Sequence, residues 1–343
     1  MRPNIYPEIR PSFRPRASVF PLLNSFYATR AILSYLTPLE LQTVVSFLNK
    51  WCYSYMKLNK NPHLIYGRSD FGLSTVYKCV EDNNVYIKSI NLNNNSIVTS
   101  LITTFPKEFT MFKSIEDSKN HIYIIGGYDS NIESVVSFSF KYESGQLTRE
   151  EPMRSPRTSF SLLIFGSSLL VIGGFYFGTS AVFERYSFIT KQWTKEASLN
   201  ISRCLPILAE FNYNCIYAFG GTDGHTPLNS IERYLDNKWE LLPPVSQSHY
   251  AVSRIGGYAH QISKNHILIF GGKNPLYKNH VGQCFVFNVT SKAFTGNIEM
   301  FEESFKDIGV FMCKSKLYTL GSTAQCFDCK KGLWRLLKEK IYP

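Results

Sequence analysis

No long hydrophobic run is present in this sequence. No stretch reaches the roughly 18 consecutive apolar residues that a membrane-spanning helix needs, so we expect no membrane span and no membrane partner. The start of the chain lacks an apolar core of about 7–15 residues, so we expect no secretory signal and a cytoplasmic protein. Charged residues make up only 18% of the 343 residues and apolar residues 44%. This balance excludes a mostly disordered chain, because burying that apolar surface offsets the chain entropy.

Motifs for catalysis, cofactors and metals are also missing. The sequence contains no nucleophile elbow, phosphate-binding loop, dinucleotide fingerprint or zinc-protease motif, and its seven histidines form no i, i+4 pair. The eight cysteines follow no disulfide spacing, and reduced thiols are expected. Cys326 and Cys329 form a CxxC pair without the second pair that a zinc site needs, so ordinary strand cysteines are favoured over metal or redox use. We therefore expect no enzyme, no cofactor and no metal.

Aromatic residues and positive charge are plentiful. The chain has 26 Phe, 21 Tyr and 4 Trp, a bias that favours half-buried strands over helices. Lys and Arg number 37 against 26 acidic residues, for a net charge of +11. Such a charge favours acidic proteins, anionic surfaces or nucleic acid as neighbours. Because the basic residues are spread along the chain, we interpret them as background charge, and nucleic acid is not the expected partner.

Residues 1–17 are rich in arginine and proline and contain a single acidic residue. An arginine-rich, acid-poor start is also typical of a mitochondrial presequence, which must form an amphipathic helix. The repeated prolines would break such a helix, so an extended arm is the favoured interpretation.

Residues 18–62 carry helical signals. Residues 37–40, Thr-Pro-Leu-Glu, form a capping box with proline at the first helical position. An apolar stripe at helical spacing follows, made by Leu41, Val44, Val45, Leu48, Cys52 and Tyr55. The sequence therefore predicts a small helical module.

The order of residues in this module resembles an F-box: Ile32-Leu33, Tyr35-Leu36, Pro38, Glu40-Leu41, Leu48 and Trp51. In F-box proteins the motif binds Skp1 and so joins a cullin–RING ubiquitin ligase. The resemblance implies a Skp1-like partner and contact residues Leu33, Leu36, Leu41, Val44, Val45, Leu48 and Trp51. The opening Leu-Pro of the family is replaced here by Phe20-Pro21-Leu22. The alternative is that these helices only cover the β domain.

The rest of the chain repeats itself. An apolar strand ending in a glycine pair recurs at Gly126-Gly127, Gly173-Gly174, Gly220-Gly221 and Gly271-Gly272, with a fifth copy at Gly321-Ser322 and a degenerate copy ending at Cys79. The first glycines at 126, 173, 220, 271 and 321 are 47, 47, 51 and 50 residues apart. Two copies continue into a second strand with Glu-Arg-Tyr, at residues 184–186 and 232–234, and then a tryptophan.

These features resemble the kelch repeat, whose period is about 50 residues. The resemblance implies an all-β fold, a six-bladed β-propeller over residues 63–343, attached to the helical module. Each blade would have four strands, with glycines at the inner strand and aromatic residues filling the space between blades. The copies around Cys79, Gly271 and Gly321 depart from the family pattern, which leaves open how the ring closes.

Three arginines recur at matching offsets before the glycine pairs: Arg157, Arg203 and Arg254. Offsets of 16, 17 and 17 residues before the first glycine place them around one face near the central channel. Arginine suits bidentate capture of carboxylate or phosphate, so the ring could receive an acidic segment. The alternative is that these arginines satisfy loop carbonyls, as in other kelch blades.

The loops after the glycine pairs supply the other candidate contacts. They contain Phe175, Tyr176, Phe177, His225 and Tyr277, residue types that include the aromatics enriched at protein interfaces. Three adjacent aromatics cannot all point inward, although packing between blades is the alternative.

Two functions compete. The first is a non-enzymatic substrate adaptor of a Skp1–cullin ubiquitin ligase, with the propeller holding the target. The second is a structural subunit of a cytoskeletal, ciliary or organellar assembly, whose partners are neighbouring subunits. The second function would place the protein at a cilium, on the cytoskeleton or in a mitochondrion instead of the general cytoplasm.

Overall fold

The structure is a computed structural model. It describes residues 63–65, 68–69, 74–78, 85–91, 96–102, 105–117, 119, 121–244, 249–273, 283–299, 309–313, 316–320, 324–329 and 331–338. The chain divides into two units, Met1–Asn49 and Lys50–Pro343, and every described residue lies in the second. The predicted arm (1–17) and helical module (18–62) therefore lie outside the described residues.

The described strands form six sheets, numbered here in chain order. Sheet 1 contains β1 (His63–Ile65), β3 (Ser74–Lys78), β4 (Val85–Asn91) and β5 (Ser96–Ile102). Sheet 2 contains β6 (Phe109–Thr110), β7 (Lys113–Glu116), β8 (Ile122–Asp129), β9 (Ser134–Glu143) and β10 (Gln146–Glu150). Sheet 3 contains β11 (Ser161–Phe165), β12 (Ser168–Ile172), β13 (Phe183–Ser187) and β14 (Trp193–Lys195).

The remaining sheets complete the series. Sheet 4 contains β15 (Ile207–Phe211), β16 (Cys215–Phe219), β17 (Ile231–Leu235) and β18 (Lys238–Leu241). A short helix, α3 (His249–Val252), precedes sheet 5, which contains β19 (Ile255–Ser263), β20 (His266–Lys273), β21 (Gln283–Asn288) and β22 (Ala293–Glu299). Sheet 6 contains β2 (Arg68–Ser69), β23 (Gly309–Cys313), β24 (Lys316–Leu320), β25 (Ala324–Asp328) and β26 (Leu333–Lys338).

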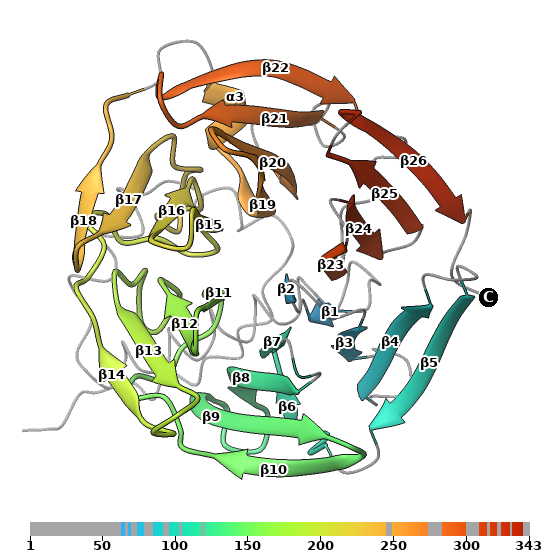
Figure 1. The fold of residues 1–343 in the computed structure, drawn as a ribbon. Helices are drawn as coiled ribbons and strands as arrows, with labels where there is room; N and C mark the ends of the chain where they lie inside the picture. Colours follow the sequence, from blue (N-terminus) through green and yellow to red (C-terminus); the bar gives the residue numbers. More distant parts are fainter. Residues whose placement is uncertain are drawn as a thin grey trace, which may run out of the picture. The chain divides into compact units, whose positions relative to one another are not determined.

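These sheets follow one another in chain order around a ring, with β5, β10, β14, β18, β22 and β26 at its rim (Figure 1). Such a ring of four- and five-stranded, mainly antiparallel sheets fits a β-propeller. In the described part of the chain, no helix is long and apolar enough to cross a membrane.

The hydrophobic core lies between neighbouring sheets. One cluster joins sheets 2 and 3 and includes Tyr123, Leu169 and Trp193, while the next joins sheets 3 and 4 and includes Phe183 and Trp239. Similar clusters join sheets 1 and 2, sheets 4 and 5, and sheets 5 and 6. Strands β12 and β16 are buried along their whole length, because each has a neighbouring sheet on both faces. The expectation that aromatic residues fill the space between the repeats is confirmed.

Strands β1 and β2 belong to opposite ends of the series. β1 pairs with β3 in sheet 1, whereas β2 pairs with β23 in sheet 6. The β2–β23 pair is parallel, and all other pairs among the described strands are antiparallel. The segment that contains β1 and β2 therefore connects the first sheet to the last, which is a contact that the repeat pattern did not predict.

The glycine pairs join each sheet to the next one. The amide of the second glycine donates a hydrogen bond to an arginine carbonyl of the following sheet: Gly127 to Arg157, Gly174 to Arg203 and Gly221 to Arg254, at 3.4, 3.0 and 2.8 Å. The first glycine of each pair packs against the same carbonyl, so a methyl group on Gly126 would lie 2.8 Å from the Arg157 oxygen. Both glycines also have positive φ angles, for example 69° and 119° at Gly173 and Gly174. Glycine is therefore required by backbone conformation and by space together.

We predict that Gly173→Ala destabilises the protein by about 3 kcal/mol, because the added methyl group collides with the Arg203 carbonyl oxygen while the residue stays left-handed. Urea denaturation measures the change. Gly166→Ala is the matched control, since Gly166 has a φ of 57° but nothing within 4 Å of an added methyl group. The control should lose only about 1 kcal/mol. Equal losses in the two variants would contradict the contact between sheets.

Candidate interaction face

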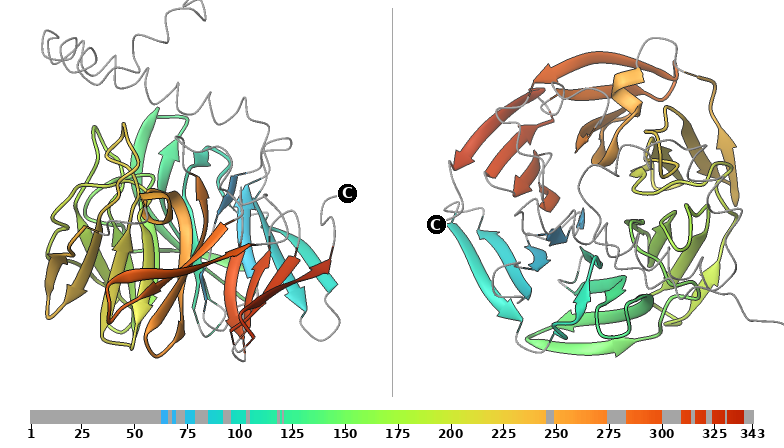
Figure 2. Two further views of the ribbon diagram at one scale, coloured as in Figure 1. Left: turned by 90° about the horizontal axis from the view of Figure 1, so that it is seen from above. Right: turned by 180° about the vertical axis from the view of Figure 1, so that it is seen from behind.

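Among the described residues, three connections within sheets lie on one side of the ring, which we call the glycine face: residues 130–133, 175–182 and 222–230. Each follows the glycine pair of its own sheet, in sheets 2, 3 and 4 respectively, so the antiparallel strand order places all three at the same end (Figure 2, left). The large hydrophobic side chains exposed there are Ile132, Tyr176 and Phe177, with exposed fractions of 64%, 40% and 63%. The candidate surface is therefore made by loop tips on a rigid frame.

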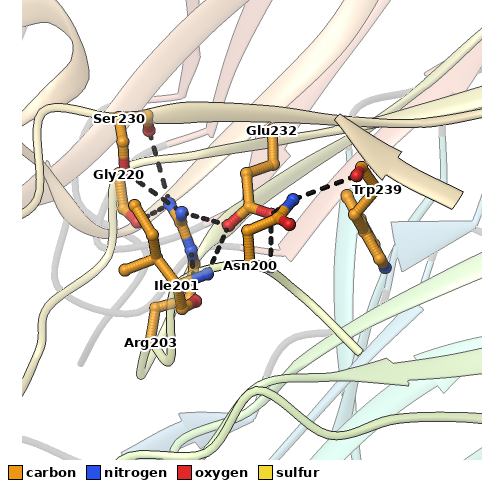
Figure 3. A network of polar contacts seen from close by, with 7 residues as sticks. All are labelled: Asn200, Ile201, Arg203, Gly220, Ser230, Glu232 and Trp239. Atoms are coloured by element: carbon orange, nitrogen blue, oxygen red, sulfur yellow. Dashed lines mark hydrogen bonds and ion pairs between the residues drawn. The ribbon is translucent and has the colours of Figure 1, made fainter. Parts of the chain in front are cut away.

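Arg203 lies below this face in a closed polar network (Figure 3). Its Nη2 donates to Glu232 Oε1 at 2.5 Å, and its Nη1 donates to the Gly220 carbonyl at 2.8 Å. Glu232 Oε2 accepts from the backbone amide of Asn200 at 2.7 Å and from its side chain at 2.9 Å. Neither Arg203 nor Glu232 is exposed. Burial lowers the pKa of Arg203 and the carboxylate of Glu232 opposes that shift.

Arg157 and Arg254 occupy the same place in sheets 3 and 5. Arg157 Nη2 lies 3.1 Å from Glu184 Oε1, and both side chains are buried. Arg254 Nη1 donates to the Gly271 carbonyl at 2.7 Å, and its guanidinium carbon lies 4.8 Å from the centre of the Phe285 ring. Burial lowers the pKa of each arginine to about 10, so both remain charged at neutral pH.

Sheet 5 departs from the pattern at one position. In sheets 3, 4 and 5, one residue of the third strand pairs with the residue two positions before the first glycine. That residue is Glu184 in sheet 3, Glu232 in sheet 4 and Phe285 in sheet 5. Phe285 therefore replaces the glutamate, and its ring offers the buried guanidinium a cation–π contact instead of a carboxylate. The sequence showed only that this repeat lacks the Glu-Arg-Tyr run.

The burial of the arginines bears on the expectation that they bind a partner. Their exposed fractions are 1% for Arg157, 0% for Arg203 and 2% for Arg254. Their described partners are carbonyls, carboxylates and a ring of the chain itself, so a ligand at the surface could not reach them without opening the fold. The structure favours the alternative, in which these side chains satisfy groups of their own sheets.

The loop residues have different placements. Tyr176 and Phe177 are exposed, Phe175 is partly buried and His225 is exposed. Tyr277 lies outside the described residues, as do Leu33, Leu36, Leu41, Val44, Val45, Leu48 and Trp51 of the predicted helical module. Sequence reasoning missed Ile132, because a lone isoleucine in a polar turn carries no signal. It also did not connect the arginines with Glu184 and Glu232, although both acids recur at equivalent positions of the repeat.

An ionic cluster ties two turns together at the opposite end of sheet 2. His121 Nδ1 lies 2.9 Å from Asp117 Oδ2, and its Nε2 lies 2.8 Å from Glu143 Oε1. Lys141 Nζ lies 2.6 Å from the other oxygen of Glu143, and this hydrogen bond lowers the pKa of Glu143. The cluster holds the connection between β7 and β8 against the connection between β9 and β10.

The described residues include a small cavity but no cluster of metal-binding side chains. A cavity of about 60 Å³ lies among inner strands, lined by residues that include Ile115, Leu162, Leu208 and Tyr258. That is well below the roughly 300–1,000 Å³ of drug-sized ligand pockets. Among the described side chains, no group of three His, Cys, Asp or Glu residues is placed to hold a metal ion.

Comparisons with known proteins agree with the repeat pattern. The kelch motif model matches residues 156–200 and 203–246, which cover sheets 3 and 4. Kelch-like protein 25 of Xenopus tropicalis is 22% identical over 277 residues, which is 75% of this chain and 44% of that protein, and the Xenopus laevis protein gives the same values. Kelch repeat protein M-T8 of Myxoma virus (strain Lausanne) is 29% identical over 138 residues, 39% of this chain and 25% of that protein. The chain spans less than half the length of its Xenopus relatives. Together these matches support a kelch-repeat protein, a class whose repeats serve protein–protein interaction.

We predict that Arg203→Met destabilises the protein by about 3–5 kcal/mol, because the substitution leaves the Glu232 carboxylate buried without its cation. Denaturant unfolding measures the loss. The matched control is Glu240→Gln, which breaks the partly exposed pair of Arg233 and Glu240 and should change stability by about 0–1 kcal/mol. Adding Glu232→Gln to Arg203→Met should recover part of the loss. A double variant no more stable than Arg203→Met would contradict the pairing.

The CxxC pair gives a pH-dependent prediction. Burial raises the pKa of the Cys326 thiol, and burial with the charge of Asp328 raises the pKa of Cys329 to about 11. Alkylation of Cys329 at pH 8 should therefore be about a hundredfold slower in the folded protein than in urea, because little thiolate forms. Quantitative mass spectrometry of the labelled peptide measures the rate.

The same pKa shift has a consequence for stability. The folded state holds this proton more tightly than the unfolded state, so its contribution is complete below about pH 8.5 and declines as the pH rises toward 11. In the alkylation experiment, equal rates in the folded and the unfolded protein would contradict the raised pKa of Cys329. They would favour metal or redox use of the Cys326–Cys329 pair.

Proposed function

We propose that this chain is a non-enzymatic protein-interaction scaffold that holds a protein partner on its glycine face. The observation that carries the proposal is the contrast between a locked frame and exposed tips. The arginines and glycine pairs that connect the sheets are buried, whereas Ile132, Tyr176 and Phe177 extend into solvent from the connections. A rigid frame with exposed loop tips suits recognition, because little entropy is lost when a partner binds.

We infer that the six sheets are the six blades of one propeller over residues 63–343. Support comes from the hydrophobic clusters between successive sheets and from the pairing of β2 with sheet 6. A complete ring would fix the angles between the loop tips of sheets 2, 3 and 4.

The specific function that we propose is a substrate adaptor of a Skp1–cullin ubiquitin ligase in the cytoplasm. This step depends on the F-box-like order of residues 18–62 and on the apolar stripe Leu41, Val44, Val45 and Leu48. The helical module would bind Skp1 and the glycine face would bind the protein to be ubiquitinated. Kelch repeats in the remainder of the chain support the target-binding half of this proposal.

The second candidate is a structural subunit of a large cytoskeletal, ciliary or organellar assembly. The arginine- and proline-rich residues 1–17 favour it, because an extended basic arm suits contacts along neighbouring subunits. In that case the helical module would cover the β domain instead of binding Skp1.

We predict that Val44→Asp combined with Val45→Asp abolishes Skp1 binding and leaves the melting temperature of the β domain unchanged, because two charges on the stripe remove its apolar contact. Pull-down with purified Skp1 and thermal unfolding measure the two effects. Gln42→Asp with Ser46→Asp is the matched control, which adds the same charge outside the stripe and should keep Skp1 binding. Unfolding of the Val44/Val45 variant, or no Skp1 binding by the wild-type chain, would count against the adaptor.

Affinity purification of the tagged chain from its own cells separates the two candidates. Stoichiometric Skp1 and cullin would support the adaptor. Axonemal, cytoskeletal or ribosomal proteins in their place would support the structural subunit.

A further inference from the structure

Two exposed aromatic rings stand side by side on the glycine face. Tyr176 and Phe177, together called the aromatic tip, occupy the connection between β12 and β13, and their ring centres are 4.1 Å apart. Their side chains belong to the large hydrophobic residues that remain exposed, Phe177 to 63%. No charged residue is present from Gly174 to Ser180. The tip is therefore an uncharged aromatic protrusion.

The fold itself does not require aromatic residues at this place. Phe177 has a φ of 55°, a left-handed conformation that is unfavourable for a residue with a β-carbon. Counted from the glycine pair, the corresponding residues of sheet 4 are Asp223 and Gly224, and Gly224 has a φ of 97°. Sheet 4 thus makes its turn with residues that suit this backbone. Sheet 3 instead places two adjacent rings at this turn and leaves both exposed. Tyr213 is also an exposed aromatic residue with a left-handed backbone, so the pairing of Tyr176 with Phe177 is the feature that points to a role outside the folded chain.

Backbone hydrogen bonds hold the aromatic tip in one conformation. Thr158 and Phe175 exchange two of them, at 3.0 and 2.7 Å, and the Ser180 amide donates to the Gly174 carbonyl at 2.9 Å. At the tip itself, the Tyr176 amide donates to the Gly178 carbonyl at 3.0 Å. A partner would therefore meet preformed rings, and binding would lose little conformational entropy.

The neighbouring connection supports the tip without adding a charge that a partner could use. A methyl group on Gly224 would lie 3.3 Å from Thr179 Cγ2, so the connections of sheets 3 and 4 touch. Asp223 Oδ1 accepts from the amides of His225 and Thr226 at 2.8 and 2.7 Å, and Oδ2 accepts from the Thr226 hydroxyl at 3.2 Å. Its carboxylate is engaged within its own turn. The aromatic rings are therefore the main contact that this pair of connections offers.

We propose that the aromatic tip inserts into an apolar pocket on a folded protein partner. The inference rests on the proposed scaffold function and adds the chemistry of the contact. A protruding tip cannot enclose a side chain, so the concave surface must belong to the partner, and buried aromatic anchors contribute most of the energy at protein interfaces. A lipid surface fits less well. One tip offers only two rings, which is a small apolar surface for attachment to a bilayer, and residues 174–180 contain no Lys or Arg to hold anionic lipids.

The test uses the full-length chain with a photo-crosslinking residue. Phe177→p-benzoylphenylalanine should crosslink to one protein in its own cells, at a peptide that lines an apolar pocket. Tyr213→p-benzoylphenylalanine is the control. Tyr213 is 88% exposed with a φ of 57°, in the connection between β15 and β16 on the opposite face. The crosslinked partner is then purified, and its affinity is measured by calorimetry.

Phe177→Gly and Tyr213→Gly form the matched pair for that measurement. Both remove an exposed aromatic ring and relieve a left-handed backbone, so neither should lower the melting temperature. If the aromatic tip is the contact, Phe177→Gly weakens binding of the partner by about tenfold or more, while Tyr213→Gly binds the partner like the wild type.

Each other outcome has a distinct meaning. Wild-type affinity in Phe177→Gly would overturn the aromatic tip and leave the scaffold function standing. Binding of the chain to phosphatidylcholine–phosphatidylserine vesicles that Phe177→Gly abolishes would overturn it in favour of a lipid surface. If the wild-type chain binds no protein at all, the scaffold function fails together with the tip.

Discussion

The contact between a glycine pair and the arginine carbonyl of the next sheet is the constraint on which this structure depends. In each of three successive sheets, the second glycine donates to that carbonyl and the first lies against it. The side chain of the same arginine points inward. In Arg203 it donates hydrogen bonds to the Gly220 carbonyl of its own sheet and to the carboxylate of Glu232. One residue thus joins two sheets through its backbone and stabilises one of them through its side chain. The loop tips can diverge because the frame does not depend on them.

The buried charges of these arginines are tolerated because each guanidinium has partners within the fold. An isolated guanidinium in an apolar interior is highly unfavourable, yet Arg203 has a carboxylate and backbone carbonyls within hydrogen-bond distance. Arg254 reaches a different solution, with a carbonyl and the face of Phe285. Sheet 5 therefore keeps the buried arginine and its contact with the Gly271 carbonyl although Phe285 takes the position of the glutamate.

Most of the β fold could be predicted from the sequence, since a period near 47 residues and paired glycines have few structural explanations. The kelch assignment agrees with the motif matches in sheets 3 and 4. The role of the arginines could not be settled in the same way. Their similar spacing places Arg157, Arg203 and Arg254 near one face but does not predict whether their side chains are buried. Burial depends on the neighbouring sheet, which a single repeat does not contain. The exposed rings were easier to anticipate, because three adjacent aromatic residues, Phe175, Tyr176 and Phe177, cannot all point inward.

The pairing of β2 with β23 has a consequence for the order of events during synthesis. β2 is among the first strands to be made and β23 is among the last, so the seam between them joins two segments more than 200 residues apart. The strands of sheets 2 to 5 are close together in the sequence, so each of these sheets can form while the polypeptide emerges, whereas this seam must wait until β23 has been made. Until then the exposed edges of sheets 1 and 6 are available to other strands. Pairing of β2 with β23 covers the edge of β23, so this seam also limits pairing between two copies of the chain.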